Sequence, residues 1–200
     1  MNEQLESYLC SRYPKLLPAE GPGCHALFGF ECSDGWFALI YAACELIQAH
    51  SNRDSEQVVA SQVKEKFGGL RFYYYGGDDY IEAVVDLVER LSESICELCG
   101  APGLIRESNG WLNARCEAHE RQCAMPTQEL DEWIRQGDSM ARVLGSALKL
   151  FAFNANATSR WLTSPAMAAG MKSPLELLQL YNGRREVLNL IGHIEHGLLL

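Results

Sequence analysis

The chain has 200 residues, of which 48% are hydrophobic and 22% are charged, and this composition excludes a disordered chain. No apolar run approaches the roughly 20 residues that a membrane-spanning helix needs. The first ten residues lack the basic segment and apolar core of a secretory signal. We therefore expect a cytoplasmic protein that does not bind membranes.

The net charge of −9 is unevenly distributed along the chain. Residues 1–125 carry 19 acidic and 10 basic side chains, whereas residues 126–200 carry 7 of each. Neither part has the basic excess of a nucleic-acid platform, so we do not expect nucleic acid as the main partner. The 8 cysteines are expected to be reduced thiols or metal ligands, because disulfides need an oxidising compartment.

The N-terminal part is predicted to be a short helix, a loop and a longer helix. Prolines and glycines before residue 24 indicate an extended loop that contains Cys24-His25. Adjacent side chains rarely point at one another, and no third partner is evident, so we do not expect catalysis at this pair. From Asp34 to about His50 the apolar residues follow a helical period, and Cys44 is expected to be a small core residue.

The segment Val58–Tyr75 is predicted to be a β-hairpin that turns at Gly68-Gly69. Basic and aromatic side chains would share its exposed face: Lys64, Lys66, Arg71, Tyr73 and Tyr75. Single-stranded nucleic acid can bind such a face by stacking and phosphate neutralisation. Strands also favour aromatic residues for cross-strand packing, and the acidic surroundings oppose phosphate, so a structural role is preferred.

A motif of metal-ligand type follows a helix that we expect to be capped by Asp79 and to carry an apolar stripe from Ile81 to Leu91. The motif is Cys96-x2-Cys99, 16 intervening residues, then Cys116-x2-His119. This spacing is close to that of a tetrahedral structural zinc site.

Four protein ligands would leave no open coordination position, so such a site stabilises the fold and performs no chemistry. Cys123 could replace His119 as the fourth ligand. The intervening loop is predicted to form a short hairpin at Asn109-Gly110. Residues from about 34 to 120 resemble uncharacterised bacterial and phage proteins with a zinc motif, and this resemblance implies no activity.

A domain boundary is predicted at Met125-Pro126, after which the pattern is helical throughout. The expected helices are Gln128–Gln136, interrupted near Gly137-Asp138, then Ser139–Phe151 and Ala155–Leu162. Trp161 is expected to anchor a small core. The whole chain is thus predicted to be α+β: an α+β domain over 1–125 with a hairpin and a zinc-knuckle-like site, and a small all-α domain over 126–200.

The last forty residues are predicted to form two capped helices. Ser173 and Glu176 form a capping box for a helix Pro174–Tyr181, which would stop where Gly183 adopts a left-handed conformation. In the next helix Val187, Leu190, Ile191 and Ile194 form one apolar stripe, and Gly197 is its stop signal. His193 and His196 are 3 residues apart but have no third ligand nearby, which favours an interface role over metal binding.

At these residues the chain resembles the toxin-binding domain of the Xre/MbcA/ParS antitoxins, over roughly Arg142–Leu200. The residues that carry the resemblance are Trp161-Leu162, a proline, Gly170, the run SPLELL, Gly183, Val187, Leu190, Ile194-Glu195 and Gly197. The resemblance implies a non-catalytic helical domain that binds and blocks a RES-domain toxin, an enzyme that consumes NAD. It also implies that the last helix and the tail face the toxin, through Arg184, Arg185, His193, His196, Gly197, Leu198, Leu199 and Leu200.

The chain departs from this family at its N-terminus, where members usually carry a DNA-binding helix-turn-helix. Residues 1–125 instead predict a zinc-bearing module, so promoter binding and dimer formation are not implied. No paired carboxylates, nucleophile elbow or phosphate loop is evident, and we do not expect an enzyme. The first functional hypothesis is a toxin-inhibiting interaction protein. The alternative is a zinc-containing nucleic-acid-associated protein that uses the aromatic and basic hairpin.

Overall fold

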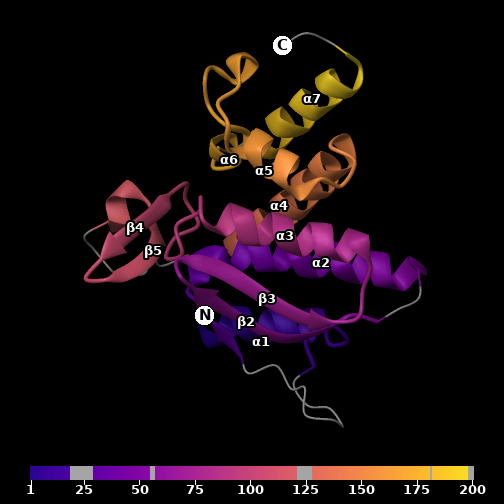
Figure 1. Ribbon diagram of the computed structural model, residues 1–200, viewed down its shortest axis with the longest axis vertical. Helices are drawn as coiled ribbons and strands as arrows, with labels where there is room; N and C mark the ends of the chain where they lie inside the picture. The colour runs from indigo at the N-terminus through magenta and orange to yellow at the C-terminus, as the bar shows by residue number, and fades with distance from the viewer. Residues whose placement is uncertain (19–28, 55–56, 121–127, 181, 198–200) are drawn as a thin grey trace.

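The computed structural model describes residues 1–18, 29–54, 57–120, 128–180 and 182–197 (Figure 1). Its helices are α1 Glu3–Arg12, α2 Phe37–Asp54, α3 Asp79–Ser92, α4 Leu130–Leu150, α5 Ala155–Thr163, α6 Pro174–Leu177 and α7 Gly183–Glu195. Its strands are β1 Phe30–Glu31, β2 Val59–Lys66, β3 Gly69–Tyr75, β4 Leu104–Ser108 and β5 Trp111–Arg115, and short 3-10 turns span Asp34–Trp36, Glu117–His119 and Met167–Ala169. The predicted α+β class is confirmed.

The larger sheet has the order β1-β2-β3, with β1 parallel and β3 antiparallel to β2. Its register aligns Phe30, Val63 and Phe72 in one buried row. The next row, Glu31, Lys64 and Arg71, points to the opposite face because side chains alternate along a strand. One face of the sheet is therefore core and the other is polar.

The turn of the β2–β3 hairpin lies one residue before the predicted position. Phe67 and Gly68 have φ values of 55° and 80°, whereas Gly69 already pairs with Lys66 in the ladder. Two successive positive φ values match the right-handed twist of the flanking strands. The prediction of Gly68-Gly69 as the turn was wrong because Phe67 itself adopts the left-handed conformation.

Helix α3 lies along β3 and covers its open edge (Figure 1). The backbone N–H of Leu70 donates to the Ser92 hydroxyl at 2.8 Å, and that of Phe72 donates to the Glu89 carboxylate at 2.8 Å. The predicted apolar stripe of this helix is buried. Its N-cap is Asp78 and not Asp79, because the Asp78 side chain accepts from the N–H groups of Tyr80 and Ile81.

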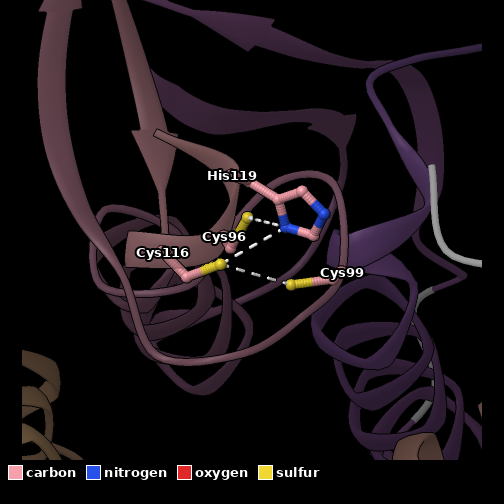
Figure 2. Close-up of side chains that lie close together, drawn as sticks. All are labelled: Cys96, Cys99, Cys116 and His119. Carbon is pink, nitrogen blue, oxygen red and sulfur yellow. Dashed lines mark hydrogen bonds between the residues drawn. The ribbon is translucent and has the colours of Figure 1, made fainter. Parts of the chain in front are cut away.

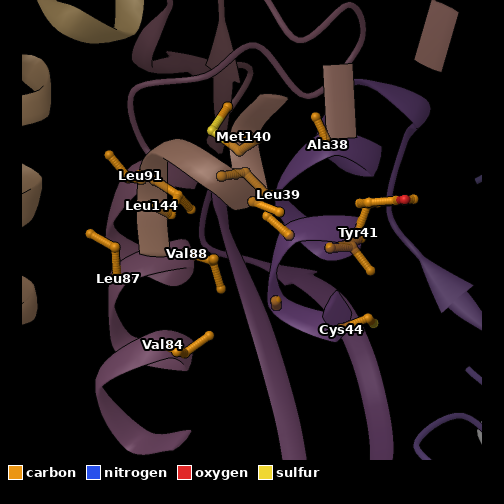
Figure 3. Close-up of a cluster of buried hydrophobic side chains, with 14 of the residues drawn as sticks. Ala38, Leu39, Tyr41, Cys44, Val84, Leu87, Val88, Leu91, Met140 and Leu144 are labelled. Atoms are coloured by element: carbon orange, nitrogen blue, oxygen red, sulfur yellow. The ribbon is translucent and has the colours of Figure 1, made fainter. Parts of the chain in front are cut away.

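Helix α2 is the centre of the core. Asp34 begins a 3-10 turn that continues into α2, and Cys44 is buried as predicted. Figure 3 shows side chains of α2 and α3, together with Met140 and Leu144 of α4, pointing into one cluster. None of the helices among the described residues is both long enough and apolar enough to cross a membrane.

Helix α4 runs without interruption from Leu130 to Leu150, so the predicted break at Gly137-Asp138 was wrong. A Cβ atom at Gly137 would lie 2.5 Å from Cγ of Tyr41 in α2, so the glycine allows the two helices to approach closely. The Tyr41 hydroxyl donates to the Asp138 carboxylate at 2.7 Å. The two residues that resemble a helix breaker thus lie where α4 packs against α2.

Among the C-terminal helices, α7 packs on α4 and α5 packs on α3, away from the sheet (Figure 1). The predicted capping box of Ser173 and Glu176 is present, but α6 has only 4 residues and is shorter than expected. Gly183 begins α7 without a left-handed backbone, so its predicted conformation was wrong. A glycine is needed there because a Cβ would lie 1.7 Å from the carbonyl oxygen of Leu177. Gly197 does adopt a left-handed conformation, with φ of 66°, as predicted for the end of α7.

Two sequence expectations concern the start and the core of this region. The boundary expected at residues 125 and 126 lies outside the described residues and stays a prediction. Trp161 is half-buried with its ring centroid 5.8 Å from that of Phe151, whereas Trp133 of α4 is 2% exposed and lies 6.1 Å from the Phe37 ring.

We predict that Gly137→Ala destabilises the protein by about 1–3 kcal/mol, because the added methyl group collides with a buried ring. The matched control is Gly192→Ala in α7, where no atom lies within 4 Å of the new Cβ. This control should stabilise the protein by roughly 0.5–1 kcal/mol through helix propensity. Urea unfolding of both variants measures the difference, and equal effects would contradict the close contact of α4 with α2.

Candidate metal centre and the exposed face of the last helix

The four residues of the cysteine and histidine motif lie together. One ligand atom from each of Cys96, Cys99, Cys116 and His119 lies within 4.8 Å of all the others. Nδ1 of His119 is 3.3 Å from Sγ of Cys116 and 3.7 Å from Sγ of Cys96. The sulfurs of Cys99 and Cys116 are 3.7 Å apart (Figure 2).

These separations match the edges of a small coordination tetrahedron. With metal–sulfur bonds of about 2.3 Å and metal–nitrogen bonds of about 2.0–2.1 Å, the edges are about 3.5–3.8 Å. The four atoms could therefore hold one metal ion after small adjustments. Three thiols and one imidazole favour a borderline-soft divalent ion over calcium or magnesium.

The local fold explains why the ligands meet. The backbone N–H of Cys96 donates to the Ala101 carbonyl at 2.8 Å, and that of Gly100 donates back to Cys96 at 2.9 Å. Gly100 has φ of 75°, which closes the tight turn behind the first two cysteines. The β4–β5 hairpin, with its predicted turn at Asn109-Gly110 confirmed, returns the chain to Cys116.

The electrostatics of the cluster differ from those of the other cysteines. A hydrogen bond from the Cys99 thiol, assisted by backbone N–H groups, lowers the pKa of Cys96 well below its usual range. Burial instead raises the pKa of the Cys32 thiol to about 12 and raises that of Cys44 further. The same hydrogen bond raises the pKa of the Cys99 thiol that donates it, so the thiolate is favoured at Cys96 alone, and the core thiols stay protonated.

A buried polar network fixes the segment Cys96–His119, which we call the knuckle, to the start of α2. Glu97, 6% exposed, accepts hydrogen bonds from the backbone N–H and hydroxyl of Ser33 and pairs with Arg115 at 3.1 Å. A Cβ at Gly35 would lie 2.3 Å from the Cys96 carbonyl oxygen. The Trp36 indole N–H donates to the Ile95 carbonyl at 3.0 Å. These supporting residues were not predicted, because no local pattern distinguishes them.

The remaining metal-site expectations concern residues elsewhere. Cys123 and the Cys24-His25 pair lie outside the described residues, so the possible replacement of His119 by Cys123 stays open. Across the part of the chain that the structure describes, the Cys96–His119 cluster is the one group of this kind. His193 and His196 are both exposed on α7 and do not join it.

Helix α7 presents a polar face to solvent, opposite its buried stripe. Val187, Leu190 and Ile191 of that stripe are buried, and Ile194 is half-buried. The residues expected at a toxin interface are exposed where the structure describes them: Arg184, Arg185, His193, His196 and Gly197. Leu198, Leu199 and Leu200 lie outside the described residues. The assignment of this face to an interface stays a prediction.

The basic and aromatic residues of the β2–β3 hairpin do share one face of the sheet. Tyr73 and Tyr75 are 41% and 53% exposed. Nζ of Lys64 lies 5.9 Å from the centre of the Tyr73 ring, and Arg71 is 3.9 Å from Glu89. Lys64 is thus engaged with a ring of the hairpin itself, and Arg71 is engaged with a carboxylate of α3.

Comparison with known proteins defines the class of the C-terminal helices. Residues 143–197 match the sequence model of the antitoxin Xre/MbcA/ParS C-terminal toxin-binding domain. The resemblance predicted for this part of the chain is therefore confirmed over residues 143–197.

Two curated relatives are both called Antitoxin Xre. The protein of Photorhabdus laumondii subsp. laumondii is 28% identical over 85 residues, which are 42% of this chain and 53% of that protein. The protein of Yersinia enterocolitica serotype O:8 is 38% identical over 56 residues, or 28% of this chain and 38% of that protein. The chain thus covers about half or less of each relative, and no solved structure matches it.

We predict that the full chain, purified without chelator, contains about one equivalent of bound metal. His119→Ala should lose most of it, whereas the matched variant Cys123→Ser should retain it. Chelation should lower the thermal midpoint by at least about 5 °C, because about 2 kcal/mol already shifts the midpoint by that much in a chain of this size. Elemental analysis and thermal unfolding measure both effects. Retention by His119→Ala and loss by Cys123→Ser would instead make Cys123 the fourth ligand.

Proposed function

We propose that the C-terminal helices bind and inhibit a RES-type, NAD-consuming toxin, and that the protein acts as a non-catalytic antitoxin. The observation that carries this proposal is the match of residues 143–197 to an antitoxin toxin-binding domain. Its physical counterpart is α7, which buries one stripe of side chains and leaves a continuous polar face for a partner. The RES type of the toxin rests on the family resemblance alone.

We also propose that the metal is zinc and that its role is structural. A Cys3His set supplies four protein ligands, so a tetrahedral ion would have no open position for a substrate. A reducing compartment such as the cytoplasm would keep these cysteines available as ligands. The zinc would fix the knuckle against the start of α2 and so support the helix on which α4 packs.

The proposed inhibitor is the whole chain and not a detached C-terminal piece. The matched segment begins inside α4, and the first half of α4 contributes Trp133 and Met140 to the common core. Inhibition should therefore be tested with the complete protein, in which α4 has its partner α2.

We predict that co-expression of the full chain with its RES-domain toxin restores growth and cellular NAD. Removal of Gly197–Leu200 should raise the dose of antitoxin needed for rescue at least about tenfold, because the tail is proposed to form part of a desolvated contact with the toxin. The control is the charge-changing variant Arg142→Glu, which alters an exposed residue of α4 and should rescue fully. Persistent growth arrest with both proteins soluble would refute inhibition of that toxin.

The alternative function, nucleic-acid association through the hairpin, leads to a separate prediction. We expect no salt-dependent binding of single- or double-stranded DNA or RNA, because the net charge is −9 and Arg71 is close to Glu89. A mobility-shift titration at two salt concentrations measures this. Binding that weakens with salt and is lost in a Lys64→Glu, Tyr73→Ala variant would favour the alternative instead.

A further inference from the structure

A basic groove lies where α4, the turn after α6 and the start of α7 meet. It is lined by Arg135 and Ser139 of α4, by Leu178 and Leu180, and by Arg184 and Arg185 together with Asn182. Three arginines from segments about 50 residues apart thus surround one hollow, and none of the described residues that line it is acidic. The remainder of the chain has excess negative charge, so this concentration of cations is a local feature.

The positive charge of the groove is only partly neutralised within the protein. Arg135 pairs with Glu132, whose carboxylate lies 2.7 Å from Nε of the arginine. Arg184 and Arg185 are exposed, and no ion pair joins either of them to an acidic group of the described residues. Both stand in the first turn of the 13-residue α7, where the helix dipole adds positive potential. An anionic group would therefore gain from entering.

The shape of the groove fits an extended segment better than a single ion. Arg135, Ser139 and Leu178 also line a second hollow that reaches Gly100 of the metal knuckle. The Gln179 side chain donates to the Gly100 carbonyl at 3.3 Å across that junction. Leu178 and the 41% exposed Leu180 give the basic groove an apolar wall. The second hollow, of about 30 Å³, has room only for a water-sized group, whereas the basic groove, of about 340 Å³, offers a peptide segment charged, polar and apolar contacts together.

We infer that this groove binds an acidic, extended segment of the toxin, with carboxylates paired to Arg184 and Arg185 beside the ion pair of Arg135 and Glu132. The inference rests on the proposed antitoxin function and specifies the chemistry of its partner. It also gives α4 a direct part in binding, because Arg135 precedes the segment that matches the antitoxin domain.

The groove itself can be tested with fluorescein-labelled hexaglutamate and the full chain, by fluorescence anisotropy. Hexaglutamate should bind the wild type, and more weakly as salt is raised. Arg184→Glu with Arg185→Glu should weaken binding about tenfold or more, since like charges then face each other. Glutamates in the first turn of a helix are favourable, so this variant should remain folded. Arg184→Ala with Arg185→Ala provides a second, milder variant.

The matched control is Arg142→Glu with Arg160→Glu, which changes the net charge equally at two exposed arginines outside the groove. It should bind hexaglutamate like the wild type. The inference would be overturned if both double variants bound hexaglutamate equally weakly, or if the wild type did not bind it. It would also be overturned if the wild type bound inorganic phosphate but not hexaglutamate.

The partner is tested by titrating the same variants against the toxin's NAD consumption. Loss of inhibition by the Arg184, Arg185 variant, with inhibition kept by the control, would support the inference. Unchanged inhibition by both variants would overturn it and leave the antitoxin function intact. If the wild type does not inhibit the toxin at all, the proposed function is refuted, and so is the toxin as the source of the acidic segment. Hexaglutamate binding then still tests whether the groove binds acidic segments.

Discussion

The close approach of α4 to α2 is the contact on which the arrangement of the whole molecule depends. Gly137 lets the helix backbone lie against the Tyr41 ring, and Asp138 accepts the hydrogen bond of the same tyrosine. The C-terminal helices have a second support, because α5 packs on α3 while α7 packs on α4. A residue without a side chain thus allows one of the two contacts that join the half with the cysteine and histidine cluster to the antitoxin-like half.

The metal knuckle supports the same junction from its other side. Its turn contacts Gly35 directly before α2, and a Cβ at Gly100 would lie 3.8 Å from the Trp133 ring of α4. A small domain with few buried residues per helix gains most from such constraints. The knuckle can therefore stabilise the surface that we propose for the toxin without contacting the toxin.

Features that depend on residues close in the sequence could be predicted, whereas contacts between distant segments could not. The clustering of the cysteines and the histidine, the hairpin at Asn109-Gly110 and the Ser173 capping box depend on residues close in the chain, and each was predicted correctly. Gly137 and Gly183 were misread as helix-ending residues, because their purpose is set by Tyr41 and by the Leu177 carbonyl. Arg135 was missed for the same reason, since only the folded chain places it beside Arg184.

The uninterrupted α4 also constrains how such a protein could have been assembled from parts. The segment shared with the antitoxins begins at residue 143, in the middle of a helix that starts at Leu130. Each residue added or removed in a helix rotates everything beyond it by about 100° and shifts it by about 1.5 Å. A recombination event at that point would have to preserve helical phase, or the grafted helices would present a different face to the rest of the molecule. The joining of a different N-terminal module to this antitoxin-like segment is therefore limited by geometry to junctions in register with α4.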